Sequence, residues 1–258
     1  GNLTLQKKYI ERYTVTGNFY ESLIKGKNIA LVGPGKNLIS KNKGVEIDGH
    51  DLVVRTNRGC ELIEKYRRDL GTRTDILYSC LIEQNENAGY WDESVIVDMY
   101  GVKYLCTTPD MSMKGIARKT VLHSMVDKKK YEKMEKIIPC RIVDHMFFTK
   151  IALEIECRPT TGYIAIYDIL RHNPKNLSIY GFDFYYSGWV NEYKKDMKNT
   201  TIELVLEKTM NSKRHNHKSM WQHSKKLLNM KNVSLDDQMR EVLHMEEFWY
   251  DKVKRLRK

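Results

Sequence analysis

Several features that would place a protein in a familiar class are missing from this sequence. None of its 258 residues belongs to an apolar run near the roughly 18 residues of a membrane span, and no signal peptide is visible. The five cysteines are scattered without a C-x-x-C pair, which argues against a zinc site or a disulfide framework and for reduced, mostly buried thiols. No internal repeat or low-complexity linker occurs, so we expect a single domain over residues 1–258.

The composition indicates a folded chain that meets anionic partners. Hydrophobic residues make up 41% of the chain and aromatic residues 10%, enough for a sizeable core. A formal net charge of +11 favours nucleic acid, phosphate-bearing ligands or an acidic membrane surface. We interpret the basic runs at 128–130 and 252–258 as solvent-exposed basic surface. For the 252–258 tail, the alternative is attraction to a membrane surface. Aromatic residues are not interleaved with these runs as stacking platforms would be, so we expect no nucleic-acid partner.

Short β-branched or aromatic runs alternate with helical patterns after a helical N-terminal extension over residues 1–27. We expect strands at 28–33, 52–56, 75–79, 94–97, 103–107 and 177–181. We expect helices near 61–70, 128–136, 162–172, 202–209, 220–229 and 236–253. This alternation predicts an α/β sandwich around a mostly parallel sheet, in which ligands bind at the C-terminal ends of the strands.

The run LVGPGKN at 31–37 ends the first expected strand in a glycine-rich turn. A nucleotide-triphosphate loop is excluded, because Ala30 stands where that loop needs a glycine and Asn37 where it needs Ser or Thr. The dinucleotide pattern also fails, since its third glycine is absent. What remains is a buried strand whose turn, with Gly33 and Gly35, lets backbone N–H groups approach a ligand.

Polar residues stand at two further places where such sheets bind ligands. Asn57 ends the second strand, where its amide could contact a base or ribose or only close a turn. The run 159–162, Pro-Thr-Thr-Gly, opens a helix and either binds an anion or only caps the helix. Tyr185 and Tyr186 follow the last expected strand, where phenols could donate to phosphate oxygens or serve as aromatic packing.

Three histidines lie in the run 214–228. A metal site is disfavoured, because no carboxylate or thiolate nearby completes a ligand set and the i, i+6 spacing does not share a helix face. We therefore expect no metal and interpret a single histidine at the mouth of a helix as a general base, since imidazole titrates near working pH. The three are His215, His217 and His223.

These segments, in this order, resemble the sialyl motifs of the sialyltransferases, glycosyltransferase family 29. LVGPGKNL, GVEIDGHDLVVRTNRG and LGTRTDILY resemble the family's large motif, and RPTTGYIAIYDIL with LSIYGFDFY resembles its small motif. The likeness covers about 28–186, with a gap at 79–157, plus the histidine run. GFDFYY is also similar to bacterial family 42 sialyltransferases.

The resemblance implies a single GT-A-like α/β/α sandwich with a mostly parallel Rossmann-like sheet and no metal-binding D-x-D motif. It implies a metal-independent, inverting transfer of sialic acid from CMP-sialic acid to a hydroxyl of a glycan acceptor, which we expect to be galactose-terminated. We expect membrane association, in the Golgi or secretory pathway if an anchor precedes Gly1 and in the cytoplasm otherwise. The acceptor linkage and the oligomeric state stay open.

The resemblance also implies a set of site residues. Tyr185, with Tyr186 or Tyr193, would hydrogen-bond the departing phosphate, and His215 would contact the donor phosphate. Independently of the resemblance, we expect the basic and polar region 187–216 to form a lid over donor and acceptor. The donor site would contain Gly33, Pro34, Gly35, Asn37, Asn57, Thr160, Thr161, Gly162, Gly181 and Phe182.

His217 is the expected base, because it precedes the helix expected at 220–229 as the family's base precedes its own, and His223 is the second candidate. The family's Glu, four or five residues after the base, is replaced here by Trp221 and Gln222.

Two further departures concern the large motif, where Pro34 replaces the family's usual Asn and the opening cysteine is missing, so no inter-motif disulfide is expected. The alternatives are another CMP-linked acid sugar such as Kdo as donor, a catalytically silent glycan-binding homologue, or a basic nucleic-acid-binding protein.

Overall fold

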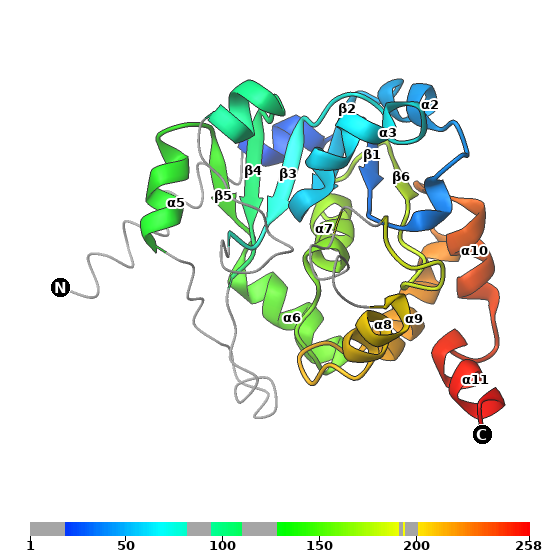
Figure 1. Ribbon diagram of the computed structural model, residues 1–258. Helices are drawn as coiled ribbons and strands as arrows, with labels where there is room; N and C mark the ends of the chain where they lie inside the picture. Colours follow the sequence, from blue (N-terminus) through cyan, green and yellow to red (C-terminus); the bar gives the residue numbers. More distant parts are fainter. Residues whose placement is uncertain (1–18, 82–93, 110–127, 191–192, 194–200) are drawn as a thin grey trace.

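A seven-stranded parallel sheet forms the centre of the structure (Figure 1). The computed structural model describes residues 19–81, 94–109, 128–190, 193 and 201–258. The strand order is β5-β4-β3-β2-β1-β6-β7, and each neighbouring pair is parallel. The strands are β1 (Asn28–Val32), β2 (Leu52–Thr56), β3 (Ile76–Ser79), β4 (Tyr104–Thr107), β5 (Cys140–Ile142), β6 (Asn176–Tyr180) and β7 (Val233–Leu235).

Helices cover both faces of the sheet. Residues 19–24 form one short helix. In the ranges that the structure describes, no helix is long and apolar enough to cross a membrane. The named helices are α2 (Gly44–Asp48), α3 (Ile63–Leu70), α5 (Lys128–Glu135), α6 (His145–Ile155), α7 (Thr161–Leu170), α8 (Ile202–Met210), α9 (His217–Ser224), α10 (Asp237–His244) and α11 (Trp249–Leu256). Three segments are 3-10 helical turns, which are tighter than an α-helix: η1 (Lys36–Leu38), η2 (Asn57–Leu62) and η6 (Lys225–Asn229). The segment η3 (Ser94–Met99) is a wider, π-helical turn.

The sequence of the central strand β1 explains why this strand is buried on both faces of the sheet. Ile29 and Leu31 pack with α6, α7 and α9 in one core cluster, while Ala30 and Val32 point to a second cluster on the other face. A parallel strand buried on both faces carries a continuous apolar run rather than an alternating one. The run N-I-A-L-V therefore specifies a central strand.

The topology places a crevice beside β1. The chain runs outward from β1 through β2, β3, β4 and β5, and then returns to add β6 and β7 on the other side of β1. The connections that leave β1 and β6 therefore lead to opposite sides of the sheet. Ligands of open α/β sheets bind at such a point, outside the carboxyl ends of the strands.

The predicted α/β architecture and parallel sheet are confirmed, but individual elements differ. The run 94–97 is part of the π-helical turn η3 and not a strand, because a short apolar run fits either conformation. The helix expected at 236–253 is two helices, because the backbone turns to an extended conformation at Met245. Strands β5 and β7 and helix α6 were not expected from the sequence. Of the extension at 1–27, residues 1–18 lie outside the described ranges.

Candidate active site

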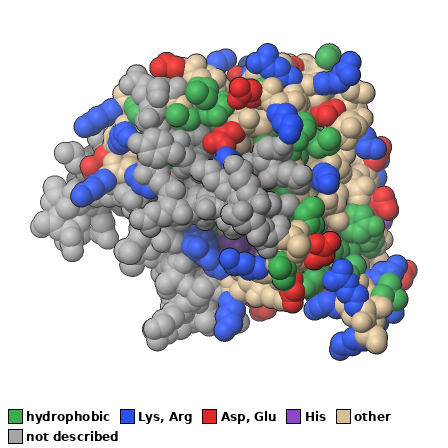
Figure 2. All heavy atoms as spheres, viewed as in Figure 1, with side chains coloured by type: hydrophobic (Ala, Val, Ile, Leu, Met, Phe, Trp, Pro, Cys, Tyr) green, Lys and Arg blue, Asp and Glu red, His purple; other side chains and the backbone are tan. Residues whose placement is uncertain are grey.

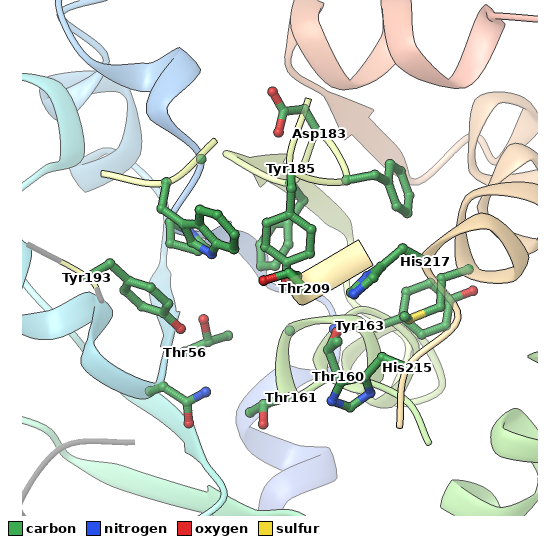
Figure 3. Close-up of a pocket in the computed structure, with 18 of the residues that line it drawn as sticks. Thr56, Thr160, Thr161, Tyr163, Asp183, Tyr185, Tyr193, Thr209, His215 and His217 are labelled. Carbon is green, nitrogen blue, oxygen red and sulfur yellow. The ribbon is translucent and has the colours of Figure 1, made fainter. Parts of the chain in front are cut away.

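A cavity of about 840 Å³ opens at the carboxyl ends of β1, β2 and β6 (Figure 3). Thr56 and Tyr193 lie on one side of it, Thr160, His215 and His217 lie opposite, and Tyr185 lies between them. Segments far apart in the sequence thus meet where the topology places a ligand. The predicted site residues that line the cavity are Pro34, Gly35, Asn57, Thr160, Thr161, Gly162, Gly181, Phe182, Tyr185, His215 and His217, together with Tyr193.

The glycine turn after β1 packs directly against the turn after β6. The N–H of Gly33 donates to the Tyr180 carbonyl at 2.7 Å, and the N–H of Gly35 donates to the Gly181 carbonyl at 2.9 Å. A Cβ on Gly33 or Gly35 would lie 2.6 Å from the Gly181 carbonyl oxygen. These glycines are needed for close backbone packing, and the expectation that their N–H groups face a ligand is wrong.

Phe182 sets the spacing between this turn and helix α7. A Cβ on Gly162 would lie 2.4 Å from a ring carbon of Phe182, and a Cβ on Gly33 would lie 2.7 Å from another. The ring therefore rests between two glycines of different motifs, with no room for a larger residue on either side.

Helix α7 begins at the cavity with a capped N-terminus. Thr160 is the N-cap residue, and its hydroxyl oxygen accepts a hydrogen bond from the N–H of Tyr163 at 3.2 Å. Thr161 and Gly162, in the first turn, line the cavity. The backbone N–H groups and the positive end of the helix dipole make such a terminus attractive to an anion.

On the opposite side, β2 ends in a polar cluster. Asn57 has a left-handed backbone (φ 44°), and its side-chain oxygen accepts from the N–H of Cys80 at 3.4 Å. Tyr193 lines the cavity on the same side as Thr56. Burial raises the pKa of Tyr193 to about 12, so the phenol keeps its proton at neutral pH and can donate it in a hydrogen bond.

Tyr185 lies between the two sides. Its ring centroid is 4.8 Å from that of Trp189 and 5.0 Å from that of His217, with the Tyr185 and His217 rings nearly perpendicular. Burial, with Tyr193 and Asp183 nearby, raises the pKa of Tyr185. This second phenol is therefore also protonated beside the cavity.

Backbone contacts with the chain before α7 hold the histidine segment in place. The N–H of Arg158 donates to the Arg214 carbonyl at 3.2 Å. His215 Nδ1 lies 2.6 Å from the Arg158 carbonyl oxygen, which can only accept, so Nδ1 carries the proton. Asn216 caps α9 by accepting from the N–H of Ser219 at 3.0 Å, which places His217 as the buried first residue of that helix.

The cavity wall is rich in positive charge. Arg158, Lys208 and Arg214 line it, and among the lining residues that the structure describes the acidic one is Asp183. Burial raises the pKa of Asp183 to about 6, although the N–H of Ser187 donates to its carboxylate at 3.0 Å. The balance of charges suits an anionic ligand. Across the described ranges, no three His, Cys, Asp or Glu side chains are grouped to hold a metal ion.

Four predicted site residues do not line the cavity. Gly33 is covered by Phe182, and the Asn37 side-chain amide donates to Asp236 at 3.2 Å. Tyr186 is 42% exposed and stacks edge-on against Trp249. His223 faces α6 and α7 behind the cavity wall.

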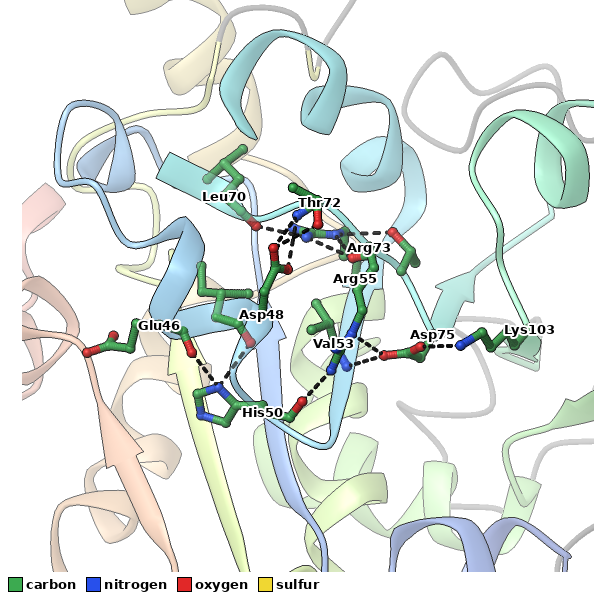
Figure 4. A network of polar contacts seen from close by, with 12 residues as sticks. Glu46, Asp48, His50, Val53, Arg55, Leu70, Thr72, Arg73, Asp75 and Lys103 are labelled. Atoms are coloured by element: carbon green, nitrogen blue, oxygen red, sulfur yellow. Dashed lines mark hydrogen bonds and ion pairs between the residues drawn. The ribbon is translucent and has the colours of Figure 1, made fainter. Parts of the chain in front are cut away.

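The charged part of the large motif also lies apart from the cavity, in a polar network (Figure 4). Arg55 is 1% exposed and donates to the Leu70 carbonyl at 2.8 Å and to the Arg73 carbonyl at 2.9 Å. The Asp75 carboxylate accepts from the N–H of Val53 at 2.8 Å and from Lys103 at 3.1 Å. Burial lowers the pKa of Arg55 to about 10, which still leaves it charged. These residues join β2 to the start of β3.

A family model for glycosyltransferase family 29 (sialyltransferase) matches residues 24–231. The chain belongs to this sialyltransferase family. Two structures of mammalian sialyltransferases, one of them in complex with Gal-beta-1-3GalNAc-ortho-nitrophenol, resemble it with TM-scores of 0.51 and 0.50 at 16% and 15% identity. Each covers 83% of this chain, which in turn covers 70% and 71% of theirs. The Campylobacter jejuni sialyltransferase CstII in complex with CMP-3FNeuAc matches with a TM-score of 0.42 at 14% identity, covering 83% of this chain and 87% of its own. No curated protein sequence matches.

Sequence reasoning missed several residues in the cavity of this sialyltransferase. Arg158 directly precedes the Pro-Thr-Thr-Gly run and Trp189 follows the tyrosines, so proximity to a motif was the available signal. Thr56 and Asp183 also stand inside quoted motifs. Lys208 carries no local signal, because only the packing of α8 brings it to the cavity.

Proposed function

We propose that the cavity binds CMP-sialic acid and that His217 is the general base for inverting transfer to a glycan hydroxyl. The observation that carries this proposal is the meeting, in one cavity, of two protonated phenols, a helix N-terminus and a buried histidine. Membership of the sialyltransferase family supports the donor and the reaction class.

The reaction breaks the bond between the anomeric carbon of sialic acid and the phosphate oxygen of CMP. Negative charge then grows on the phosphate, and Tyr185 and Tyr193 stabilise it by hydrogen bonding. The cations Arg158, Lys208 and Arg214 offset the charges of the donor carboxylate and phosphate. Because CMP carries one phosphate, these groups replace the divalent metal that a diphosphate donor needs.

The acceptor hydroxyl attacks the anomeric carbon from the face opposite CMP and loses its proton to the neutral imidazole of His217. This displacement inverts the configuration at that carbon. His215, with its proton on Nδ1 held by the Arg158 carbonyl, lies on the same side of the cavity as Thr160. We assign it to donor positioning.

The partners follow from the same chemistry. We expect a galactose-terminated acceptor and a weak attraction of the basic 252–258 tail to anionic membranes. A Golgi or secretory location remains a prediction from the family.

The decisive experiment is incubation with CMP-sialic acid and galactose-terminated disaccharides, with and without EDTA. We expect transfer that EDTA does not reduce, and loss of transfer in EDTA would contradict the metal-free mechanism. CMP-Kdo in place of CMP-sialic acid tests the other donor. Absence of both transfer and CMP release would indicate a silent homologue.

The base is tested by His217→Ala, which should lower kcat by at least about 100-fold while CMP binding by calorimetry is retained. His244→Ala, at an exposed position on α10, is the matched control and should leave kcat unchanged. Retained transfer in His217→Ala would remove His217 from the mechanism.

A further inference from the structure

Three side chains joined by hydrogen bonds lie behind the cavity wall that carries His217. His223, on α9, has its Nε2 2.6 Å from the Glu154 carboxylate of α6. Its Nδ1 is hydrogen-bonded to the hydroxyl of Tyr163, on α7. Tyr163 is 4% exposed and lines the same cavity as His217 (Figure 3). The three side chains therefore join three helices at the edge of the site.

The direction of these hydrogen bonds is set by chemistry. The Glu154 carboxylate can only accept, so His223 Nε2 donates to it, and the free lone pair on Nδ1 accepts from the Tyr163 hydroxyl. The Tyr167 hydroxyl lies 3.3 Å from that of Tyr163, and Lys226 Nζ lies 3.2 Å from His223 Nε2. Burial and the charge of Lys226 lower the pKa of His223, which favours this neutral tautomer.

Helix α9 needs such an external connection. It has only eight residues before the chain tightens into η6, and helices this short are marginal by themselves. Residues six apart on a helix point in different directions. His217 can therefore face the cavity while His223, on the same helix, contacts α6 and α7.

We propose that His223 is a positioning residue, which holds α9 through Glu154 and Tyr163 so that His217 keeps its place in the cavity. This inference rests on the proposed role of His217 as the base. It also assigns a role to the second histidine candidate for the base, since His223 does not line the cavity. In metal sites, the hydrogen-bond partners that orient a ligand change activity by about 10- to 100-fold, and we expect an effect of similar size here.

Tyr163→Phe removes only the hydroxyl. In His223→Gln the amide N–H can still donate to Glu154, but the amide oxygen bound to the same carbon no longer lies at the position of Nδ1, where it would accept from Tyr163. Each should lower kcat by about tenfold with the KM for CMP-sialic acid within about twofold. The double variant should lose no more than either single variant, because both remove one interaction. Tyr20→Phe, which removes another buried hydroxyl that bonds to Tyr78, is the matched control and should leave kcat unchanged. Unchanged kcat in Tyr163→Phe, or additive losses, would overturn the proposal.

The pH dependence of kcat separates positioning from base catalysis. In His223→Gln the acidic limb of the profile should persist, because the proposed base, His217, is unchanged. Disappearance of that limb, or a loss as complete as in His217→Ala, would make His223 the base instead.

Amide hydrogen exchange gives a readout that needs no transfer. Residues 217–220 should exchange faster in Tyr163→Phe and His223→Gln than in the unmodified chain, and unchanged exchange would overturn the proposed link. If the unmodified chain transfers no sialic acid, the proposed function fails, while this measurement still tests the positioning of α9.

Discussion

At the residue scale, Asp183 is a buried acid that lowers the stability of the folded state as pH rises. It is 1% exposed and lies in the loop after β6, beside Tyr185. Burial raises its pKa to about 6, above the ordinary value near 3.9. The folded state therefore holds the proton more tightly than the unfolded state, and the free energy of unfolding falls as pH rises from about 4 to about 6.

Asp183→Asn should remove this pH dependence and raise the free energy of unfolding above pH 6 by up to about 3 kcal/mol. The gain should be smaller at pH 4.5, where the folded Asp183 is mostly protonated. Thermal unfolding at pH 4.5 and 7.5 measures the difference. Asp98→Asn makes the same change at an exposed position and should shift neither value. An equal gain at both pH values would contradict the burial argument.

At the scale of elements, α7 is fixed at both ends. Its N-terminus lies at the cavity, and Asp168, in its last half, is fully buried against Arg141 of β5 at 2.5 Å. The Tyr78 hydroxyl of β3 donates to the same carboxylate at 2.6 Å. Burial alone would raise the pKa of Asp168, but Arg141 and Arg171 outweigh it and hold that pKa below its usual range.

Arg141→Met should lower the free energy of unfolding by about 3–5 kcal/mol, because it leaves a buried carboxylate without its main partner. Asp168→Asn added to it should recover part of the loss, since the uncompensated charge is removed. Urea unfolding measures both. Lys133→Met, on the exposed side of α5, is the control for loss of one cation. A double variant as unstable as the sum of the two single variants would contradict the coupling.

At the scale of the whole molecule, the net charge of +11 favours anionic surfaces. Figure 2 shows Lys and Arg side chains at the lower right, where α11 lies in Figure 1. Some of this charge is offset, because Asp251 pairs with Lys218 and Lys254. Lys252 and Lys258 are exposed at the same end.

Lys252→Glu with Lys258→Glu should weaken binding to vesicles that contain anionic lipid, by several-fold per residue at low salt. Lys129→Glu with Lys133→Glu, on α5 at the other end of the molecule, changes the net charge equally and serves as the control. Co-sedimentation at two salt concentrations measures the effect. Equal losses in both variants would assign the attraction to net charge rather than to the C-terminal helix.

Much of the fold and part of the site could be predicted from local patterns. Strand β1 was predictable because it carries a continuous apolar run, as buried parallel strands do, and β2 and β6 were predictable because each is five residues long with three apolar or aromatic side chains. Strand β5 was not, because Arg141 interrupts a three-residue run and only Asp168, far along the chain, makes that charge tolerable in the core. In the same way, no local pattern indicates the role of Arg55 in the large motif, because its hydrogen bonds go to the carbonyls of Leu70 and Arg73 in a buried structural network.

The sequence by itself determined the α/β class, the order of the sheet's central strands along the chain and the family, because each depends on local periodicity or on motifs in a fixed order. The tertiary structure decided what each polar residue faces. Asn37 and His223 stand in motifs as prominent as those of Asn57 and His217. Their contacts, Asn37 with Asp236 and His223 with Glu154, nevertheless hold them away from the cavity. Residues 33 and 35 of LVGPGKN need glycine because two backbones meet there, a contact between positions nearly 150 apart that no local pattern encodes.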